Sequence, residues 1–335
     1  MTSQEISVLS AHRQNPSADT QVEVVLLLDP SDGIARSADL FRSPAFFRLH
    51  AASFARAWYA LAMDASNGQC LASAWFAETA PGHACSGAYG SFGGFHSPHD
   101  PLPIGLASRM IVAVEEELRA RDISRITLTL PPLAYEPESQ AEWMNVLMRV
   151  GYTPAPPDLS FHVVVTDEDL DTRMDECNRS GVRTAERKGL FVRELREHEW
   201  AHAYQVTTAN RVRRGHRASM TLDALLELDA AIPDTLHWFG VFWGERMIAA
   251  SVCMRASTTS LHVIALGDVD GAERPPSVPV LVSQLYNWCR DRGIEQLDLG
   301  TASESSVPNE EQLAHYRSLG FEVSSRFTLE KELQT

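Results

Sequence analysis

An internal repeat is the feature of this sequence that most constrains its fold. The pattern Arg-x-Arg-x-Ile followed by a short apolar run occurs at residues 119–128 and again, 171 residues later, at residues 290–299. The apolar positions of the helical pattern before each run match at the same offset. A Gly-aromatic pair at residues 151–152 also returns at residues 320–321. Together these matches predict the duplication of a domain of about 165 residues.

The second copy, residues 297–321, predicts a strand, a polar loop and a helix. Its apolar run ends at Gly300, which is typical of a buried strand and its exit. Asn309 followed by two acidic residues is a favourable helix start, and Gly320 suits the left-handed residue that ends a helix. A last strand then follows.

Each half therefore predicts several antiparallel strands, a helix, a strand, a second helix and a closing strand. This order indicates an α+β fold with two tandem domains of mixed, mostly antiparallel sheets flanked by helices. We expect a loose polar tail at residues 1–20, a first domain at 21–166 and a second at 167–335. The strand at residues 161–165 is expected to close the first domain.

The composition is that of an ordinary globular protein, with 44% hydrophobic and 22% charged residues. No apolar run reaches the roughly 18 residues of a membrane span, and the polar N-terminus is not a secretory signal. The five cysteines form no Cys-x-x-Cys pair, so they predict neither a disulfide framework nor a zinc site. We therefore expect a cytoplasmic protein without a metal.

The charge is strongly uneven along the chain. The net charge is −15, which argues against a broad nucleic-acid surface, yet residues 173–217 contain eleven Lys or Arg and six Asp or Glu. Such a zone is typical either of a site for a phosphate-bearing ligand or of a solvated helix face.

Three short motifs give the chain a family resemblance. Residues 309–321, ending in Tyr-Arg-Ser-Leu-Gly-Phe, resemble the closing segment of the GNAT N-acyltransferase fold. Residues 183–192 and the Asp-Leu-Gly at residues 298–300 resemble the linker and the strand end of Fem-type aminoacyltransferases of peptidoglycan synthesis. The resemblance implies two tandem GNAT-like (acyl-CoA N-acyltransferase-like) domains, the second catalytic and the first an acceptor site or scaffold.

The sequence also departs from these families. The acetyl-CoA signature, Gln/Arg-x-x-Gly-x-Gly/Ala before the central helix, is missing from both halves. That signature directs backbone N–H groups at a pyrophosphate, so its absence weakens an acetyl-CoA assignment. The coiled-coil arm of the Fem-type enzymes is also absent.

The resemblance points to three candidate catalytic residues. Tyr316 stands where many GNAT enzymes place a general-acid tyrosine, whereas the first half has Leu147 there; the alternative is a core aromatic. Arg317 is a candidate phosphate or oxyanion partner, or else a solvated side chain. Asp298, at the end of its strand, could orient or deprotonate an acceptor amine, or simply cap the following turn.

The basic zone supplies the candidate donor-binding residues. Arg183, Arg187 and Arg211 are the arginines expected to hold an anionic donor, and Lys188 joins them because it is one of only two lysines in the chain.

Two functions from different classes fit these features. The first is an N-acyltransferase or aminoacyltransferase that joins an acyl group from aminoacyl-tRNA or acyl-CoA to an amine such as a cell-wall precursor or peptide. It would carry no tightly bound cofactor, acyl-CoA being a possible donor substrate. The second is a non-catalytic ligand-binding module built on a duplicated GNAT fold. The sequence does not identify the donor, the acceptor or the oligomeric state.

Overall fold

The computed structural model describes residues 16–33, 39–88, 92–98, 102–213, 220–269, 275–304 and 306–333. The chain divides into two compact units. Unit 1 comprises Met1–Pro131, Glu136–Ala155 and Thr328–Thr335, and unit 2 comprises Pro132–Tyr135 and Pro156–Phe327. Each unit therefore contains segments from both halves of the sequence. The predicted tail lies mostly outside the described residues.

Unit 1 is built on a seven-stranded sheet with three helices in its described part. The strand order is β1 (Val22–Leu27), β2 (Ala57–Asp64), β3 (Cys70–Ala80), β4 (His83–Ser86), β5 (Arg125–Thr129), β16 (Thr328–Glu332) and β6 (Thr153–Pro154). The helices are α1 (Pro44–Ala51), α2 (Ile104–Arg119) and α3 (Pro137–Arg149). Gly68, at φ +71°, lies in the turn of the β2–β3 hairpin, where an Asn-Gly pair suits the left-handed backbone.

Unit 2 repeats this plan. Its sheet has the order β15 (Glu322–Arg326), β7 (Asp158–Val164), β12 (Gln296–Thr301), β11 (Ser260–Asp268), β10 (Arg246–Arg255), β9 (Leu236–Trp243) and β8 (Leu190–Glu194). The helices are η1 (Leu170–Thr172), α4 (Glu176–Arg187), α5 (Glu197–Arg213), α6 (Leu222–Ala231), α7 (Val278–Asp291) and α8 (Glu310–Ser318). A two-stranded sheet, β13 (Ser303–Glu304) and β14 (Val307–Pro308), precedes α8.

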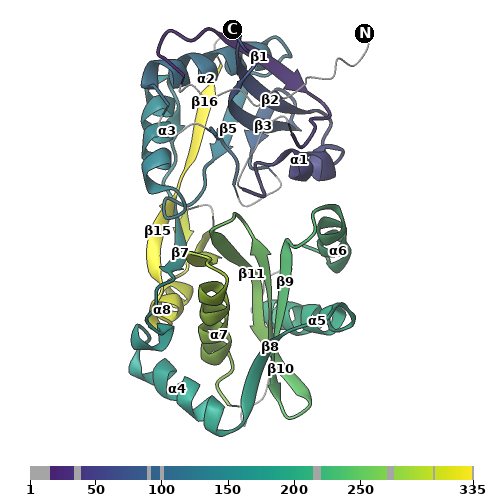
Figure 1. Cartoon of the computed structure of the whole chain (residues 1–335), viewed down its shortest axis with the longest axis vertical. Coiled ribbons are helices and arrows are strands. Elements are labelled where there is room, and N and C mark those ends of the chain that lie inside the picture. Colours follow the sequence, from purple (N-terminus) through teal and green to yellow (C-terminus); the bar gives the residue numbers. More distant parts are fainter. Residues whose placement is uncertain are drawn as a thin grey trace. The chain divides into compact units, whose positions relative to one another are not determined.

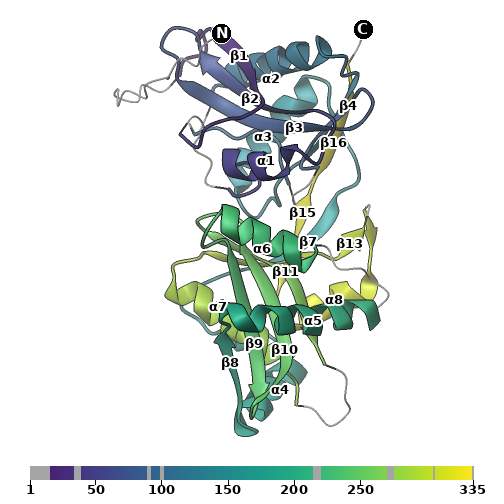
Figure 2. The same ribbon diagram turned by 90° about the vertical axis from the view of Figure 1, so that its right-hand side faces the viewer.

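Helices cover both faces of the unit 2 sheet. On one face the buried side chains of α7, among them Leu281 and Leu285, pack with Leu261 of β11 and Leu297 of β12. On the other face α5 crosses β9 and β10, as Figure 2 shows. Gly267 allows α5 to approach β11, because a Cβ there would lie 2.7 Å from Cβ of Asn210.

The duplication is evident in the sheets. β5 pairs parallel with β4 and antiparallel with β16, while β12 pairs parallel with β11 and antiparallel with β7. The two repeated strands thus occupy equivalent positions, as the sequence predicts. The predicted α+β fold class, with two tandem domains of mixed, mostly antiparallel sheets flanked by helices, is confirmed.

The closing strands are exchanged between the halves, which corrects the predicted assignment of one strand. The sequence assigns residues 161–165 to the first domain, but β7 lies in the unit 2 sheet between β12 and β15. In return β16, the last strand of the chain, lies in the unit 1 sheet beside β5, shown in yellow in Figure 1. The domain boundary at 166/167 therefore does not separate the two compact units.

Prolines explain where the chain leaves the first sheet. β6 has only two residues and ends at Pro154, and Pro156 and Pro157 follow. Proline has no N–H to donate to a strand ladder, so this segment cannot extend the pairing. The next strand begins at Asp158, in the sheet of unit 2.

Candidate active site

A fork between β11 and β12 is the main irregularity of the unit 2 sheet. These parallel strands pair only where residues 260–262 lie beside residues 296–298. β11 then continues to Asp268 and β12 to Thr301 without pairing to each other, although both strands are fully described. The register of β11 with β10 also shifts beside Val263, and such a bulge bends a strand. Beyond the three paired residues, the facing edges of β11 and β12 make no ladder hydrogen bonds to each other.

Asp298 lies at the base of the fork and is fully hydrogen-bonded there. It is 2% exposed. Its Oδ2 accepts hydrogen bonds from Tyr135 Oη at 2.7 Å and His262 Nδ1 at 3.0 Å, and its Oδ1 accepts one from the Gly300 N–H at 2.7 Å. Burial alone would raise the pKa of this carboxyl, but His262, Tyr135 and the Gly300 N–H outweigh it and hold the pKa below the usual value. Asp298 is therefore an ionised anchor for its neighbours.

His262 is the group at this position that can exchange a proton with a substrate. Because the ionised carboxylate only accepts, the Nδ1 of His262 must carry the hydrogen that it donates to Asp298. In the neutral ring Nε2 is then the basic nitrogen. Nε2 makes no hydrogen bond to any described residue, and the side chain is 13% exposed. Gly300, at φ +81°, leaves room for the ring, since a Cβ there would lie 3.1 Å from its Cε1.

A second imidazole flanks Asp298 on its other side. The registers of β11, β12, β7 and β15 place His262, Asp298, His162 and Glu322 in one row across the sheet. Paired residues on neighbouring strands point to the same face. Burial lowers the pKa of His162, although Asp298 and Glu322 partly oppose this, and its Nδ1 is buried without a partner among the described residues.

Sequence reasoning found Asp298 but missed His262, His162 and Tyr135. The signal for His262 was a polar residue inside the apolar strand at residues 261–266, one strand before Asp298. Tyr135 carried no signal, because a tyrosine between two prolines is typical of any loop.

Tyr316 lies on the opposite face of the sheet from Asp298. Its ring contacts Phe161 edge-on, with the ring centroids 5.4 Å apart. It packs against the hydrophobic core to which α7 contributes. Phe161 and His162 are successive strand residues and point to opposite faces, and Asp298 lies on the His162 side. The Tyr316 Oη accepts a hydrogen bond from Gln312 Nε2 at 2.7 Å.

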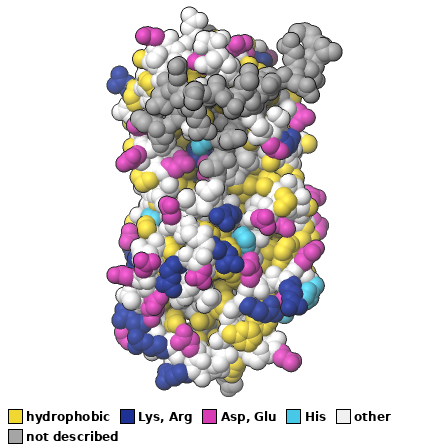
Figure 3. Space-filling view, viewed as in Figure 1, with side chains coloured by type: hydrophobic (Ala, Val, Ile, Leu, Met, Phe, Trp, Pro, Cys, Tyr) yellow, Lys and Arg dark blue, Asp and Glu magenta, His cyan; other side chains and the backbone are white. Residues whose placement is uncertain are grey.

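Arg317 and the basic residues of α4 are exposed. The side chain of Arg317 contacts no hydrogen-bonding or acidic partner in the described part of the chain. Arg183, Arg187 and Lys188 all lie on the exposed surface of α4 or at its end, where basic side chains gather in Figure 3. Of these, Arg187 donates to Thr184 Oγ1 at 3.1 Å on its own helix.

Arg211 is the predicted donor-binding residue that the structure places beside the fork. It is half-buried on α5, and its Nη1 donates to the carbonyl oxygen of Ile264 at 3.4 Å. Ile264 is two residues beyond His262 on β11. The structure therefore brings together Asp298 and Arg211 along the fork strands, but not the α4 residues with either of them.

The start of α7 lacks several of the donors that a pyrophosphate cradle would use. Pro275, Pro276 and Pro279 are three of the five residues at positions 275–279, and none has a backbone N–H. A helix N-terminus binds phosphate through such groups. These prolines support the sequence argument against an ordinary acetyl-CoA site.

Unit 1 has no fork at the equivalent place in its described part. β4 pairs with β5 along all four of its residues, and Cys85 and Thr127 stand where unit 2 has His262 and Asp298. The Gly93 N–H then donates to the Thr129 carbonyl oxygen at 2.7 Å. The loop before α2 thus occupies the end of β5.

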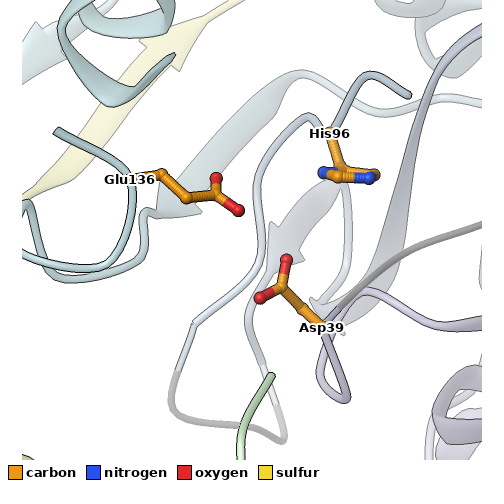
Figure 4. Close-up of side chains that lie close together, drawn as sticks. All are labelled: Asp39, His96 and Glu136. Carbon is orange, nitrogen blue, oxygen red and sulfur yellow. The ribbon is translucent and has the colours of Figure 1, made fainter. Parts of the chain in front are cut away.

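Unit 1 instead contains a buried charge cluster, whose acidic and imidazole side chains converge in Figure 4. Ligand atoms of Asp39, His96 and Glu136 all lie within 4.8 Å of one another, as in a metal site. However, the buried Arg42 guanidinium already binds both carboxylates, with Nε 2.7 Å from Asp39 Oδ2 and Nη2 3.1 Å from Glu136 Oε1. Arg42 therefore supplies the cation that these carboxylates require.

Comparison with solved structures identifies the fold. The chain resembles a crystal structure of FemX, with a TM-score of 0.68, 10% identity, and coverage of 88% of this chain and 92% of that one. A tandem GNAT protein from the clavulanic acid biosynthesis pathway matches with a TM-score of 0.55 at 12% identity, covering 94% and 99%. The C-terminal domain of a putative lysylphosphatidylglycerol synthetase from Agrobacterium fabrum also gives 0.55 at 11% identity, covering 88% and 87%.

These likenesses show that the chain has the tandem GNAT fold found in Fem-like and GNAT acyltransferases. Neither a protein-family model nor a curated protein sequence matches it. Among the described residues, no helix combines the length and the apolar composition that a membrane span requires.

Proposed function

We propose that this protein is an N-acyltransferase that forms an amide between an activated acyl or aminoacyl group and an amine, in the fork of unit 2. The observation that carries the proposal is the His262–Asp298 pair at the base of that fork. An amide-forming enzyme needs a base for the attacking ammonium, and a carboxylate-oriented imidazole is such a base. The tandem GNAT fold supports this reaction class.

The reaction assigns a role to each group of the pair. His262 Nε2 takes a proton from the acceptor amine, whose nitrogen attacks the acyl carbon. The bond from that carbon to the leaving oxygen or sulfur then breaks. Asp298 holds the ring by its Nδ1 and stabilises the imidazolium that forms. Backbone N–H groups along the open edges of the fork would stabilise the tetrahedral oxyanion.

Tyr316 is the proposed acid for the leaving group. It lies on the face of the sheet opposite His262. The proposal requires that a donor entering the fork from that side reaches its hydroxyl. The leaving oxygen or sulfur would take the tyrosine proton. Arg317, exposed on the same helix, stays a candidate partner for the donor's negative charge.

The donor is an aminoacyl-tRNA or an acyl-CoA. The prolines at the start of α7 disfavour a pyrophosphate cradle there. We propose that Arg183, Arg187 and Lys188 of α4, with Arg211 beside the fork, attract the phosphates of the donor. The acceptor is a small amine, a peptide or a cell-wall precursor.

The test pairs purified protein with defined donors and amines. Charged tRNAs and acyl-CoAs are incubated with amine and peptide acceptors, and mass spectrometry detects the amide. His262→Gln should lower kcat by about 100-fold or more while the thermal melt is unchanged. His202→Gln, at an exposed histidine of α5, is the matched control and should keep wild-type turnover.

Two outcomes would count against this function. Equal turnover in His262→Gln and wild type would show that His262 is not the general base. Binding of a donor without any product under all pairings would favour the non-catalytic ligand-binding module.

A further inference from the structure

A short segment from the first half of the sequence is bound onto unit 2 beside the fork. Pro132–Tyr135 follows β5 and precedes α3, yet it belongs to the second compact unit. The Leu133 N–H donates to the Ser325 carbonyl oxygen at 3.0 Å, and the Ala134 N–H donates to Ser324 Oγ at 3.1 Å. Gln296 Nε2 also donates to the Ala134 carbonyl oxygen. The backbone is therefore fixed immediately before Tyr135.

This fixation delivers the Tyr135 hydroxyl to the carboxylate that holds His262. Tyr135 Oη is 2.7 Å from Asp298 Oδ2, the same oxygen that His262 Nδ1 approaches at 3.0 Å. The Gly300 N–H holds the other oxygen. Three donors from three separate segments thus fix the carboxylate plane. One carboxylate oxygen accepts about two hydrogen bonds, so Tyr135 and His262 share the capacity of Oδ2.

We propose that Tyr135 is a positioning residue, which fixes the Asp298 carboxylate and limits how strongly it pulls on His262. Asp298 is 2% exposed, so water cannot readily replace a lost tyrosine donor. Without Tyr135, Oδ2 has only the Nδ1 hydrogen to accept, and that bond becomes stronger and shorter. The second unit's site is then completed by the first half of the sequence, and residues 167–335 alone would lack this control.

Other groups face the same carboxylate and define the controls. His162 lies beside Asp298 on β7, with Glu322 beyond it. On the other edge of β11, Met254 of β10 pairs with His262 and carries no charge. Tyr204 of α5 is a tyrosine of the same unit whose hydroxyl donates to the Met220 carbonyl oxygen at 3.1 Å, away from this row. Tyr204→Phe is therefore the matched control.

The first measurement needs no substrate. In the full-length protein labelled with ¹⁵N-histidine, the Nδ1-bound hydrogen of His262 should give a downfield proton resonance, which His262→Gln removes and so assigns among the twelve histidines. Tyr135→Phe should move this resonance further downfield, and Tyr204→Phe should leave it in place. In an Asp298→Ala background, which has no side-chain acceptor, Tyr135→Phe should have no further effect on His262.

An unchanged His262 resonance in Tyr135→Phe, with an unchanged melt, would overturn the proposal. So would equal shifts in Tyr135→Phe and Tyr204→Phe.

The second measurement rests on the proposed function. With an identified donor and acceptor, Tyr135→Phe should lower kcat by about tenfold with KM unchanged. A carboxylate that has lost one of its three donors can turn and draw the imidazole away from its reactive position, which raises the energy of the transition state but does not weaken substrate binding. If wild type shows no turnover, the proposed function fails while the resonance still decides the role of Tyr135. If wild type is active and Tyr135→Phe keeps the full kcat, the positioning role is refuted although the function stands.

Discussion

Replacing Arg42 by methionine should destabilise unit 1 strongly. The Arg42 side chain is 1% exposed and binds Asp39, which is 3% exposed, and Glu136, which is 30% exposed. It also donates to the Phe95 carbonyl oxygen at 3.3 Å. Methionine preserves much of the volume but removes every one of these donors. The two carboxylates then lie together without the guanidinium that binds both.

The expected loss follows from this geometry. Removing one partner of a buried ion pair costs about 3–5 kcal/mol, because the remaining charge is left uncompensated. This corresponds to roughly 150- to 5,000-fold in the unfolding equilibrium, at about 1.36 kcal/mol per factor of ten. Arg48→Met, on helix α1 just after the turn that contains Arg42, is the control. Arg48 and its partner Asp32 are 33% and 71% exposed, so breaking their pair should cost about 0–1 kcal/mol.

The loss should grow as the pH rises. Burial raises the pKa of Asp39 even with Arg42 beside it, and Arg42 is the main group that opposes this. Without Arg42 the pKa of Asp39 in the folded protein rises further. At any pH between the pKa of Asp39 in the unfolded chain and this higher value, the unfolded chain binds fewer protons than the folded protein. Stability then falls with rising pH. For Glu136, burial raises the pKa but Arg42 more than offsets it, so its stabilising contribution above its usual pKa is also lost in the variant.

The assay must report unit 1 separately, because a chain with two compact units need not unfold in one step. Hydrogen exchange of β2 and β3 in increasing urea, at about pH 5 and about pH 7.5, isolates its unfolding free energy. The reasoning is refuted if Arg42→Met and Arg48→Met lose equal stability, or if the loss in Arg42→Met is larger at the acidic pH.

Three further predictions concern other positions. Gly300→Ala should cost about 1–3 kcal/mol in urea unfolding and displace His262, because φ is +81° and the new Cβ would lie 3.1 Å from the ring; wild-type stability would contradict this. Lys331→Met should cost about 3–5 kcal/mol in unit 1 exchange by leaving the Glu115 carboxylate buried and unpaired, and a loss below 1 kcal/mol would contradict it. Tyr316→Phe should lower kcat by about 100-fold with an unchanged melt, and full turnover would end its role as acid.

Much of the fold could be predicted from sequence because it depends on local patterns. The helix at residues 310–318, its start at Asn309 and its end near Gly320, at φ +88°, follow from capping and periodicity. Because the sequence is repeated, the elements predicted in one copy could also be assigned to the other. The sheet that contains β7 could not be predicted, because the sequence of an apolar strand does not indicate which sheet it joins. Only the prolines before β7 indicated that the chain leaves the first sheet there.

The site was predictable only in part. Asp298 stood out because a polar residue at a strand end next to glycine is unusual in an apolar run. His262 belongs to the site because the strand register places it beside Asp298. Tyr135 belongs to it because its loop, 163 residues away in the sequence, contacts Asp298. Such contacts depend on tertiary structure and leave no spacing in the sequence.

The asymmetry of the two copies is the strongest argument for placing chemistry in one of them. Both sheets have the same strand order, and both have a parallel pair at the repeated strand. In unit 1 that pair holds Cys85 beside Thr127, and the Gly93 N–H occupies the end of β5. In unit 2 it holds His262 beside Asp298, and the strands separate immediately afterwards. An open edge and an oriented imidazole therefore occur together in unit 2, while the described part of unit 1 has neither at the equivalent position.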